Sequence, residues 1–253
     1  MRLTGRRVRR LGTTLVVLGV FLVAYASAVV FWRDPATDVY AKWRQHQLSS
    51  ELDGAFEAYR GDAAFAALDR ALSAGDPSGP EARRAAVEVA ARRFRRTLTL
   101  SDPIGRIKIP KLGIGSVFVH GTRWGADLSK GPGHYEQTSL PGLGKTTAIA
   151  GHRTTFGAPF RHIDELEAGD RIVIEMPYGT FVYRVFAHEI VDSGDWSVVR
   201  ERGFDTLVLS ACHPLYSSKQ RWIVYARLAR IELPAKERSE EAATAASGLR
   251  ESR

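Results

Sequence analysis

The sequence contains a single cysteine, Cys212, among its 253 residues. One cysteine excludes an intramolecular disulfide, and it also excludes a cysteine-rich zinc site. No segment has the acidic spacing of a calcium-binding loop, and no H-x-x-x-H spacing indicates a histidine metal site, so we predict no metal and no other cofactor. A lone cysteine is most often a small buried apolar residue, so a chemical role for Cys212 needs support from its surroundings.

A concentrated basic face is lacking in the part of the chain that follows residue 96. The formal net charge is +8, but the first ten residues contribute +5 and residues 81–96 contribute +4. Residues 97–253 carry 20 basic and 18 acidic groups. Because a nucleic-acid-binding domain usually carries its basic residues on the folded domain, this distribution argues against nucleic acid as a partner.

An uncharged apolar run occupies residues 11–32. It is long enough to cross a hydrocarbon core of about 30 Å as a helix. The arginine-rich residues 1–10 predict a cytoplasmic basic tail, with the remainder of the chain outside the cell. The alternative is a signal peptide, because the small residues at Ala24–Ala26 and Ala26–Ala28 resemble cleavage sites. The run continues to Trp32, which favours an uncleaved single-pass anchor, and both interpretations export the domain.

Residues 33–100 are predicted to form a helical stalk or accessory region. Apolar residues recur at helical spacing through residues 38–73, a turn-rich break follows at 74–80, and a second helix is predicted at 81–96. The arginines of this second helix are predicted to form a solvated face, and the alternative is a surface near anionic envelope polymers or lipid head groups. No chemistry is visible in this region.

Residues 101–233 have the pattern of a mainly β domain. Short apolar runs alternate with Gly- and Pro-containing turns, which indicates a closed β-barrel. The predicted strands are 106–110, 116–121, 146–151, 171–176, 181–191, 205–212 and 221–233. The polar tail at 234–253 is predicted to be disordered.

Candidate catalytic residues gather at predicted strand ends. Cys212 ends one strand, and a thiol nucleophile needs a base or a cation beside it. His213 is adjacent, but neighbouring residues of a strand point to opposite faces, so we favour His152, which directly follows the strand at 146–151. Arg221 opens the next strand, where a fixed cation could hold a peptide carbonyl or an oxyanion. Export of a protein with one cysteine further favours a reactive thiol.

Three ordered blocks carry a resemblance to a known family: residues 131–142, 146–170 and 206–228. Together they resemble sortases, and the order His–Cys–Arg with Cys followed by His-Pro is most similar to the class E sortases of actinobacteria, which are Gram-positive. The resemblance implies an eight-stranded sortase β-barrel with short helices. It also implies a cysteine transpeptidase, in which Cys212 is the nucleophile, His152 the general acid and base, and Arg221 a ligand of substrate carbonyls.

The resemblance further implies the partners of such an enzyme. These are surface proteins with a C-terminal LAxTG- or LPxTG-like sorting signal, cleaved between Thr and Gly through a thioacyl-enzyme. The acceptor would be an amine of a peptidoglycan precursor, similar to lipid II, or a pilin lysine. The catalytic domain would lie outside the cell membrane.

Three further residues are candidates for substrate binding. His134 lies in a matching block, and it is predicted either to line the substrate groove or to be a hydrogen-bonded structural histidine. The family usually has Thr directly before the nucleophile, where this chain has Ala211, and Ser210 could partly replace the missing hydroxyl. This departure puts the detail of the substrate pocket in doubt more than it does the nucleophile.

Two other functions are weighed against a transpeptidase of this kind. A catalytically silent, sortase-shaped binding or scaffold protein is compatible with Ala211, although the three candidate catalytic residues argue against it. An L,D-transpeptidase is a second alternative, but its motif has Gly before the nucleophile and a closer Arg than Arg221. A papain-like protease would place Cys before His, the reverse of this chain.

Overall fold

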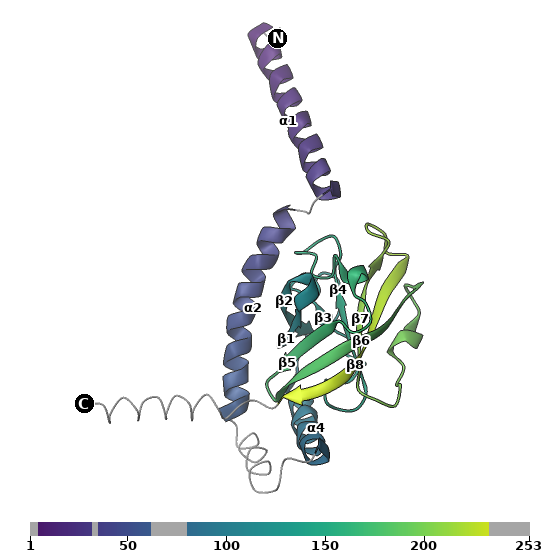
Figure 1. Ribbon diagram of the computed structural model, residues 1–253. Helices are drawn as coiled ribbons and strands as arrows, with labels where there is room; N and C mark the ends of the chain where they lie inside the picture. Colours follow the sequence, from purple (N-terminus) through teal and green to yellow (C-terminus); the bar gives the residue numbers. More distant parts are fainter. Residues whose placement is uncertain (1–4, 32–34, 62–79, 233–253) are drawn as a thin grey trace, which may run out of the picture.

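The computed structural model describes residues 5–31, 35–61 and 80–232. Its eight described strands form one closed barrel in the order β1-β2-β3-β4-β7-β8-β6-β5 (Figure 1). This confirms the predicted mainly β fold with eight strands. The predictions for the tail at 234–253, for Trp32 and for the break at residues 74–79 lie outside the described residues.

The strands of the barrel follow the predicted runs closely, with one addition. β3 is only two residues long, so it has no alternation by which the sequence could reveal it. The strands are β1 (Pro103–Ile109), β2 (Ile114–His120), β3 (Gly133–His134), β4 (Thr146–Gly151), β5 (Arg171–Met176), β6 (Gly179–Asp192), β7 (Thr206–His213) and β8 (Gln220–Glu232). Three short 3-10 helices connect them: η1 (Pro110–Leu112), η2 (Ile163–Glu165) and η3 (Trp196–Val199).

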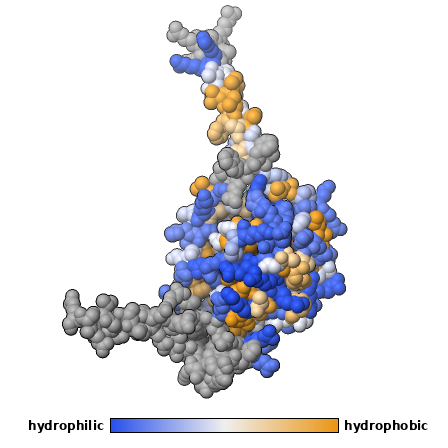
Figure 2. Space-filling view, viewed as in Figure 1, coloured by the Kyte–Doolittle hydropathy of each residue, from blue (hydrophilic) through white to orange (hydrophobic). Residues whose placement is uncertain are grey.

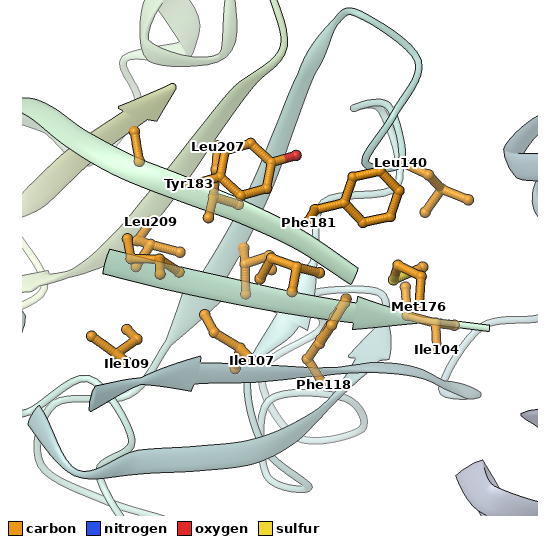
Figure 3. Close-up of a cluster of buried hydrophobic side chains, with 14 of the residues drawn as sticks. Ile104, Ile107, Ile109, Phe118, Leu140, Met176, Phe181, Tyr183, Leu207 and Leu209 are labelled. Atoms are coloured by element: carbon orange, nitrogen blue, oxygen red, sulfur yellow. The ribbon is translucent and has the colours of Figure 1, made fainter. Parts of the chain in front are cut away.

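The main core fills the inside of the barrel. Figure 3 shows aromatic and aliphatic side chains from facing strands, among them Phe118, Phe181 and Tyr183, packed together. On β7, Leu207, Leu209 and Ala211 belong to this core, whereas Val208 packs in a separate cluster on the outer surface. Because successive side chains of a strand alternate between its faces, this assigns the odd-numbered residues of β7 to the inside and the even-numbered ones to the outside.

Helix α1 (Gly5–Phe31) contains the apolar run. Its segment Arg9–Ala28 has a mean hydropathy of 2.0 over 20 residues, and none of it is buried inside the structure. Figure 1 shows α1 projecting away from the barrel, and Figure 2 shows its apolar band above a mostly hydrophilic surface. By length and composition α1 could cross a membrane, although a signal sequence passes the same test.

The region predicted as a stalk packs against the barrel through two helices. Helix α4 (Pro80–Thr97) contributes four side chains to the main core: Val87, Ala90, Ala91 and Phe94. Helix α2 (Pro35–Gly61) forms a second cluster with β2, made of Leu48, Leu52, Phe56, Val117 and Val119. Helix α4 therefore joins the main core, whereas α2 packs on β2 through a second cluster.

One arginine of α4 departs from the predicted solvated face. The Arg95 guanidinium donates hydrogen bonds to the backbone carbonyls of Thr138, at 2.6 Å, and Glu136, at 3.0 Å. It thereby ties α4 to the connection between β3 and β4. The prediction from the sequence placed all the arginines of this helix on one solvated face. Helical spacing does not show which turn of the helix contacts the barrel, so the role of Arg95 could not be predicted.

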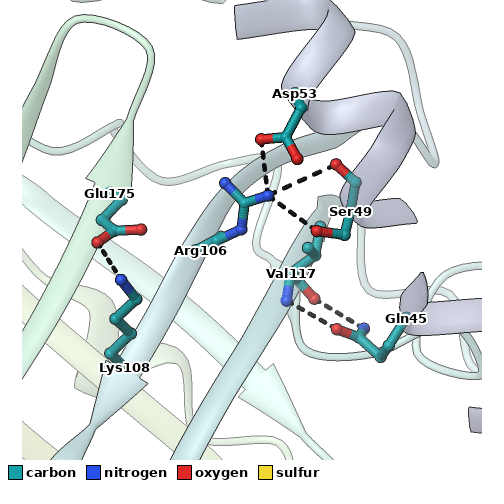
Figure 4. A network of polar contacts seen from close by, with 7 residues as sticks. All are labelled: Gln45, Ser49, Asp53, Arg106, Lys108, Val117 and Glu175. Atoms are coloured by element: carbon teal, nitrogen blue, oxygen red, sulfur yellow. Dashed lines mark hydrogen bonds and ion pairs between the residues drawn. The ribbon is translucent and has the colours of Figure 1, made fainter. Parts of the chain in front are cut away.

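Gln45 of α2 completes the hydrogen bonding of β2 (Figure 4). The backbone N–H of Val117 donates to the Gln45 Oε1 at 2.8 Å, and the Gln45 Nε2 donates to the Val117 carbonyl at 3.0 Å. The same Nε2 donates to the Lys130 carbonyl at 2.9 Å. β3 pairs with β2 only at Val119 and His120, so the side-chain amide occupies the place of a neighbouring strand.

Replacing Gln45 by Ala is expected to lower the free energy of unfolding by about 2–3 kcal/mol, because the Val117 N–H and C=O lose their partners. Chemical denaturation of the purified chain measures this change. Gln47→Ala is the matched control, since Gln47 of the same helix accepts a bond from Arg44 at 2.8 Å, and its loss should cost less than about 0.5 kcal/mol. Equal costs for the two variants would show that Gln45 does not secure β2.

Candidate active site

The ends of β4 and β7 lie side by side because the two strands are parallel and in register. The paired residues run from Thr146 with Thr206 to Gly151 with Ala211. The next residue along each strand is His152 on one side and Cys212 on the other. The fold thus places the two predicted catalytic residues at neighbouring positions on one end of the barrel.

Strand β8 brings Arg221 to the same place. Antiparallel pairing sets Arg221 directly opposite Cys212. Ile223 and Tyr225 of β8 pack in the outer cluster with Val208, so alternation assigns Arg221 and Cys212 to the outer face as well. Cys212 is half-buried. A thiol at this position is neither sealed in the core nor freely exposed.

The His152 ring lies in a partly apolar environment. Its centroid is 5.3 Å from that of Phe156 in the loop after β4. Burial lowers the pKa of His152 below the usual 6.5, so the neutral imidazole predominates at neutral pH. Its Nε2 is shielded from solvent and has no hydrogen-bond partner among the residues that the structure describes.

His213 faces the other side of the strand. Its ring centroid is 5.4 Å from that of Trp222, which packs against the main core. The Arg153 Nη1 is 3.4 Å from the His213 Nδ1 and 3.4 Å from the Cys212 carbonyl oxygen. The alternation that favoured His152 over His213 is therefore the arrangement found in the structure.

Arg153 was not singled out from the sequence, yet it shapes this end of the barrel. Its side chain is only 3% exposed and forms an ion pair with Asp164 at 2.6 Å. Its Nε donates to the Arg161 carbonyl at 3.1 Å. Arg153 thus connects the end of β4 to the end of β7 and to the following loop. The sequence signal for it is indirect: a buried arginine needs an acid, and Asp164 follows eleven residues later.

Arg221 borders a small, mostly apolar pocket on the outer face. Its Nη1 donates to the carbonyls of Ser218 and Gln220, both at 2.9 Å, which fixes the guanidinium beside the β7–β8 loop. The pocket is lined by Tyr135, Val191, Ser193, Asp195, Trp196, Val198, Val199, Val208, Ser210, Arg221 and Ile223. Ser210, predicted to bind substrate, therefore lies next to Arg221, with its Oγ 3.5 Å from the Tyr135 hydroxyl.

The other two residues predicted to bind substrate lie elsewhere. Ala211 is 2% exposed and belongs to the main core, so its side chain points into the barrel. His134 has no exposed surface. Its Nε2 is 3.0 Å from the Ser139 carbonyl and its Nδ1 is 3.2 Å from the His120 Nδ1. The structure therefore corrects the placement of Ala211, and of the two interpretations of His134 it matches the hydrogen-bonded structural histidine.

No group of three or more His, Cys, Asp and Glu side chains that could hold a metal ion is found within residues 5–31, 35–61 and 80–232.

Burial of His134 makes the stability of the fold sensitive to acid. It lowers the pKa of His134 from 6.5 to about 3, and burial also lowers the pKa of the neighbouring His120. Because the unfolded chain binds the proton more tightly, stability is complete above pH 6.5 and declines as the pH falls toward 3. At pH 5 we expect a loss of about 2 kcal/mol from His134.

Denaturation curves between pH 7.5 and about pH 4.5 test this expectation, since that window lies across the unfolded-state pKa of histidine. His134→Gln should flatten the dependence on pH. His162→Gln should retain it, because His162 is exposed and pairs with Glu165 on the surface. The same slope in wild type and His134→Gln would refute the assignment.

Comparisons with known proteins agree with this geometry. Residues 107–229 match the family model described as the sortase domain. Sortase D of Bacillus subtilis is 33% identical over 127 residues, covering 49% of this chain and 62% of that protein. Sortase SrtE1 of Streptomyces coelicolor is 34% identical over 137 residues, covering 48% of this chain and 39% of that protein. The chain thus aligns with less than two thirds of the length of these curated relatives.

Solved structures give the same result. A crystal structure of sortase E1 from Streptomyces coelicolor with a tripeptide in the active site superposes with a TM-score of 0.50 at 29% identity, covering 52% of this chain and 90% of that one. The SrtF sortase from Corynebacterium diphtheriae superposes with a TM-score of 0.52 at 28% identity, covering 55% and 91%. The sortase domain is thus matched across the barrel that joins His152, Cys212 and Arg221, and residues 107–229 of this chain form a sortase domain.

Proposed function

We propose that this protein is a membrane-anchored cysteine transpeptidase with Cys212, His152 and Arg221 as its catalytic residues. The observation that carries the proposal is the register of β4, β7 and β8, which sets the three residues at adjoining positions on one end and one face of the barrel. A nucleophile, a proton carrier and a fixed cation are the groups that acyl transfer requires.

In the first half of the reaction the Cys212 thiol passes its proton to His152, and the thiolate sulfur attacks the carbonyl carbon of Thr in an LAxTG- or LPxTG-like signal. The tetrahedral intermediate collapses, the Thr–Gly C–N bond breaks, and a proton passes from the His152 imidazolium to the departing glycine amine. The products of this half-reaction are a thioester between Thr and Cys212 and a released C-terminal peptide. The lowered pKa of His152 makes its protonated form a strong acid, which suits donation to a poor leaving group.

In the second half an acceptor amine attacks the thioester. His152 takes the proton of that amine, the C–S bond breaks, and Cys212 leaves as a thiolate, to which His152 returns the proton. The acceptor that we assign is an amine of a lipid-linked peptidoglycan precursor or a pilin lysine. Both halves are balanced in protons, because the proton that His152 delivers in the first half is recovered in the second.

Arg221 is assigned to the carbonyl oxygen on which negative charge develops. A guanidinium carries five N–H donors in a fixed plane. The bonds to the Ser218 and Gln220 carbonyls use Nη1 and hold the plane in place. We assign the remaining donors to the substrate, where a preorganised donor stabilises the oxyanion without reorganising during the reaction.

The apolar pocket beside Arg221 is assigned to the sorting signal. Tyr135, Trp196 and Val208 offer apolar surface for the first, aliphatic residue of the signal, and Ser210 offers a hydroxyl. The related sortase E1 was solved with a tripeptide in its active site, which supports an extended peptide at this end of the barrel. Since Ala211 points into the core, the missing Thr hydroxyl does not alter the wall of this pocket.

We assign α1 to a single-pass anchor with the barrel on the outer side of the membrane. Its uncharged apolar stretch is long enough to span the bilayer, and the arginine-rich residues before it favour a cytoplasmic N-terminus.

Full-length protein in detergent should cleave LAxTG and LPxTG peptides between Thr and Gly. Cys212→Ala should abolish cleavage, and His152→Ala should lower kcat/KM by about 10²–10⁴-fold through loss of proton transfer. His213→Gln is the matched control and should keep most of the activity, because its ring faces Trp222 on the other side of the strand. Mass spectrometry of the active protein should detect the thioacyl adduct on Cys212.

A wild-type protein that cleaves no such peptide and forms no adduct would refute the enzyme assignment in favour of a binding or scaffold protein. Loss of activity in His213→Gln equal to that in His152→Ala would instead refute the assignment of the proton carrier.

Arg221→Lys should lower kcat/KM by about 100-fold, because an ammonium group keeps the charge but not the planar set of donors. Arg227→Lys is its control, since Arg227 lies on the same strand but stacks on Phe204, 3.9 Å from the ring centroid. Peptide-cleavage kinetics of the two variants measure the difference. Equal rates in wild type and Arg221→Lys would remove the guanidinium from the mechanism.

A further inference from the structure

An aromatic cluster surrounds the loop that follows His152. We define it as Tyr40 and Trp43 of α2, Trp124 of the loop after β2, and Phe156. The ring centroids lie 6.1 Å apart for Tyr40 and Trp43, 6.3 Å for Tyr40 and Phe156, and 6.4 Å for Trp124 and Phe156. The four rings therefore form one continuous surface assembled from three separate segments of the chain.

The two tryptophans of this aromatic cluster are more exposed to solvent than tryptophan side chains usually are. Trp124 is 71% exposed, Trp43 is 54% exposed and Tyr40 is 41% exposed. Val39, beside Tyr40 in the sequence, is 71% exposed as well. A contiguous group of large exposed aromatic side chains marks an interaction surface more often than isolated ones do.

The chain itself limits how far the aromatic cluster can lie from the candidate membrane span. The Phe156 backbone N–H donates to the Thr37 Oγ1 at 3.1 Å. Thr37 is six residues after Phe31, the last residue of α1. Six fully extended residues reach at most about 20 Å. If α1 ends at the outer surface of the bilayer, Thr37 lies within this distance of that surface, and Phe156 is hydrogen-bonded to Thr37.

The charges around the aromatic cluster suit a lipid surface. Lys42 and Arg44 are close to it in sequence, and the Arg44 guanidinium lies 5.7 Å from the Trp43 ring centroid. Asp38 also lies in this segment, whereas the Asp127 side chain is fully buried and paired with Arg123. Tryptophan and tyrosine concentrate at membrane–water interfaces because their rings are apolar and their N–H or O–H groups are polar, and neighbouring cations pair with lipid phosphates.

We propose that the aromatic cluster docks into the outer membrane–water interface and holds the Cys212 end of the barrel facing the bilayer. This rests on the proposed function of α1 as an anchor. The aromatic cluster is linked directly to the candidate active site, because its member Phe156 packs against the His152 ring. His152 in turn lies at the position next to Cys212, given the register of β4 and β7. The site would then meet substrates and acceptors that are themselves held at the membrane, instead of peptides arriving from bulk solvent.

Tryptophan quenching in vesicles tests this proposal with the full-length chain. Vesicles of phosphatidylcholine and phosphatidylglycerol, brominated near the head group, quench only the tryptophans that enter the interface. Trp43→Phe and Trp124→Phe should each lower the quenched fraction of the emission, because they remove quenched residues. Trp196→Phe should raise it, because Trp196 is 59% exposed on η3 and lies outside the aromatic cluster.

The outcomes separate docking from anchoring. A chain that fails to float with vesicles contradicts both the anchor and the docking proposal. The other outcome is a chain that floats with vesicles, while Trp43→Phe and Trp124→Phe raise the quenched fraction as Trp196→Phe does. That result would retain the anchor and overturn the docking proposal.

The lone cysteine allows a second measurement. A maleimide attached to a lipid head group should modify Cys212 faster, relative to a soluble maleimide, in wild type than in a variant that combines Tyr40→Ser, Trp43→Ser and Trp124→Ser. We expect this ratio to fall several-fold in the variant while the rate with the soluble reagent stays the same, which also shows that the variant is folded. An unchanged ratio would overturn the proposal.

Discussion

The in-register parallel pairing of β4 with β7 is the constraint on which the candidate site depends. Parallel strands cannot be joined by a tight turn, so the chain must leave the end of β4 and return to the start of β7 by a long connection. Here that connection contains β5 and β6, which close the far side of the barrel. A shift of one residue in the pairing would turn Cys212 toward the core and His213 toward the outer face, since side chains alternate along a strand. The same pairing thus closes the barrel and selects the histidine.

Two buried contacts hold the end of β4 where this pairing requires it. A Cβ atom on Gly151 would lie 2.5 Å from the Phe160 ring, so glycine permits the loop to fold closely over the strand. Arg153 then crosses to the Cys212 carbonyl and pairs with Asp164. The arginine of this pair is 3% exposed and the aspartate 38%, so desolvation of the guanidinium offsets part of the attraction. The effect of the pair is on position. His152 lies between Gly151 and Arg153, and both of these residues are held by these contacts.

The sequence predicted the elements whose hydrophobic pattern is long enough to read. The runs at 146–151 and 205–212 have strand length and apolar character, so the ends of β4 and β7, and with them His152 and Cys212, could be located. β3 is too short for periodicity. This also explains why the sequence left two interpretations of His134 open, since its burial follows from pairing that no local pattern reveals. Arg95 and Arg153 were missed for a related reason. Their partners are backbone carbonyls or a distant acid, which composition and spacing do not identify.

Helices α2 and α4 show the same limit at a larger scale. Their amphipathic spacing indicated helices but not the surfaces that they cover, so a spacer and a layer of the core looked alike. The distinction matters for function, because the first turns of α2 contact the loop beside His152. The region with no visible chemistry is therefore physically joined to the loop beside a candidate catalytic residue.

The Gln45 amide has a consequence beyond the hydrogen bonds that it satisfies. A barrel closed by a strand as short as β3 leaves a stretch of β2 with backbone groups pointing outward, and open strand edges recruit other chains by β-augmentation. By occupying Val117 with a side chain instead of a strand, α2 denies that edge to extended peptides. That edge of the barrel is thereby closed both to extended peptides and to the same edge of a second copy of the chain.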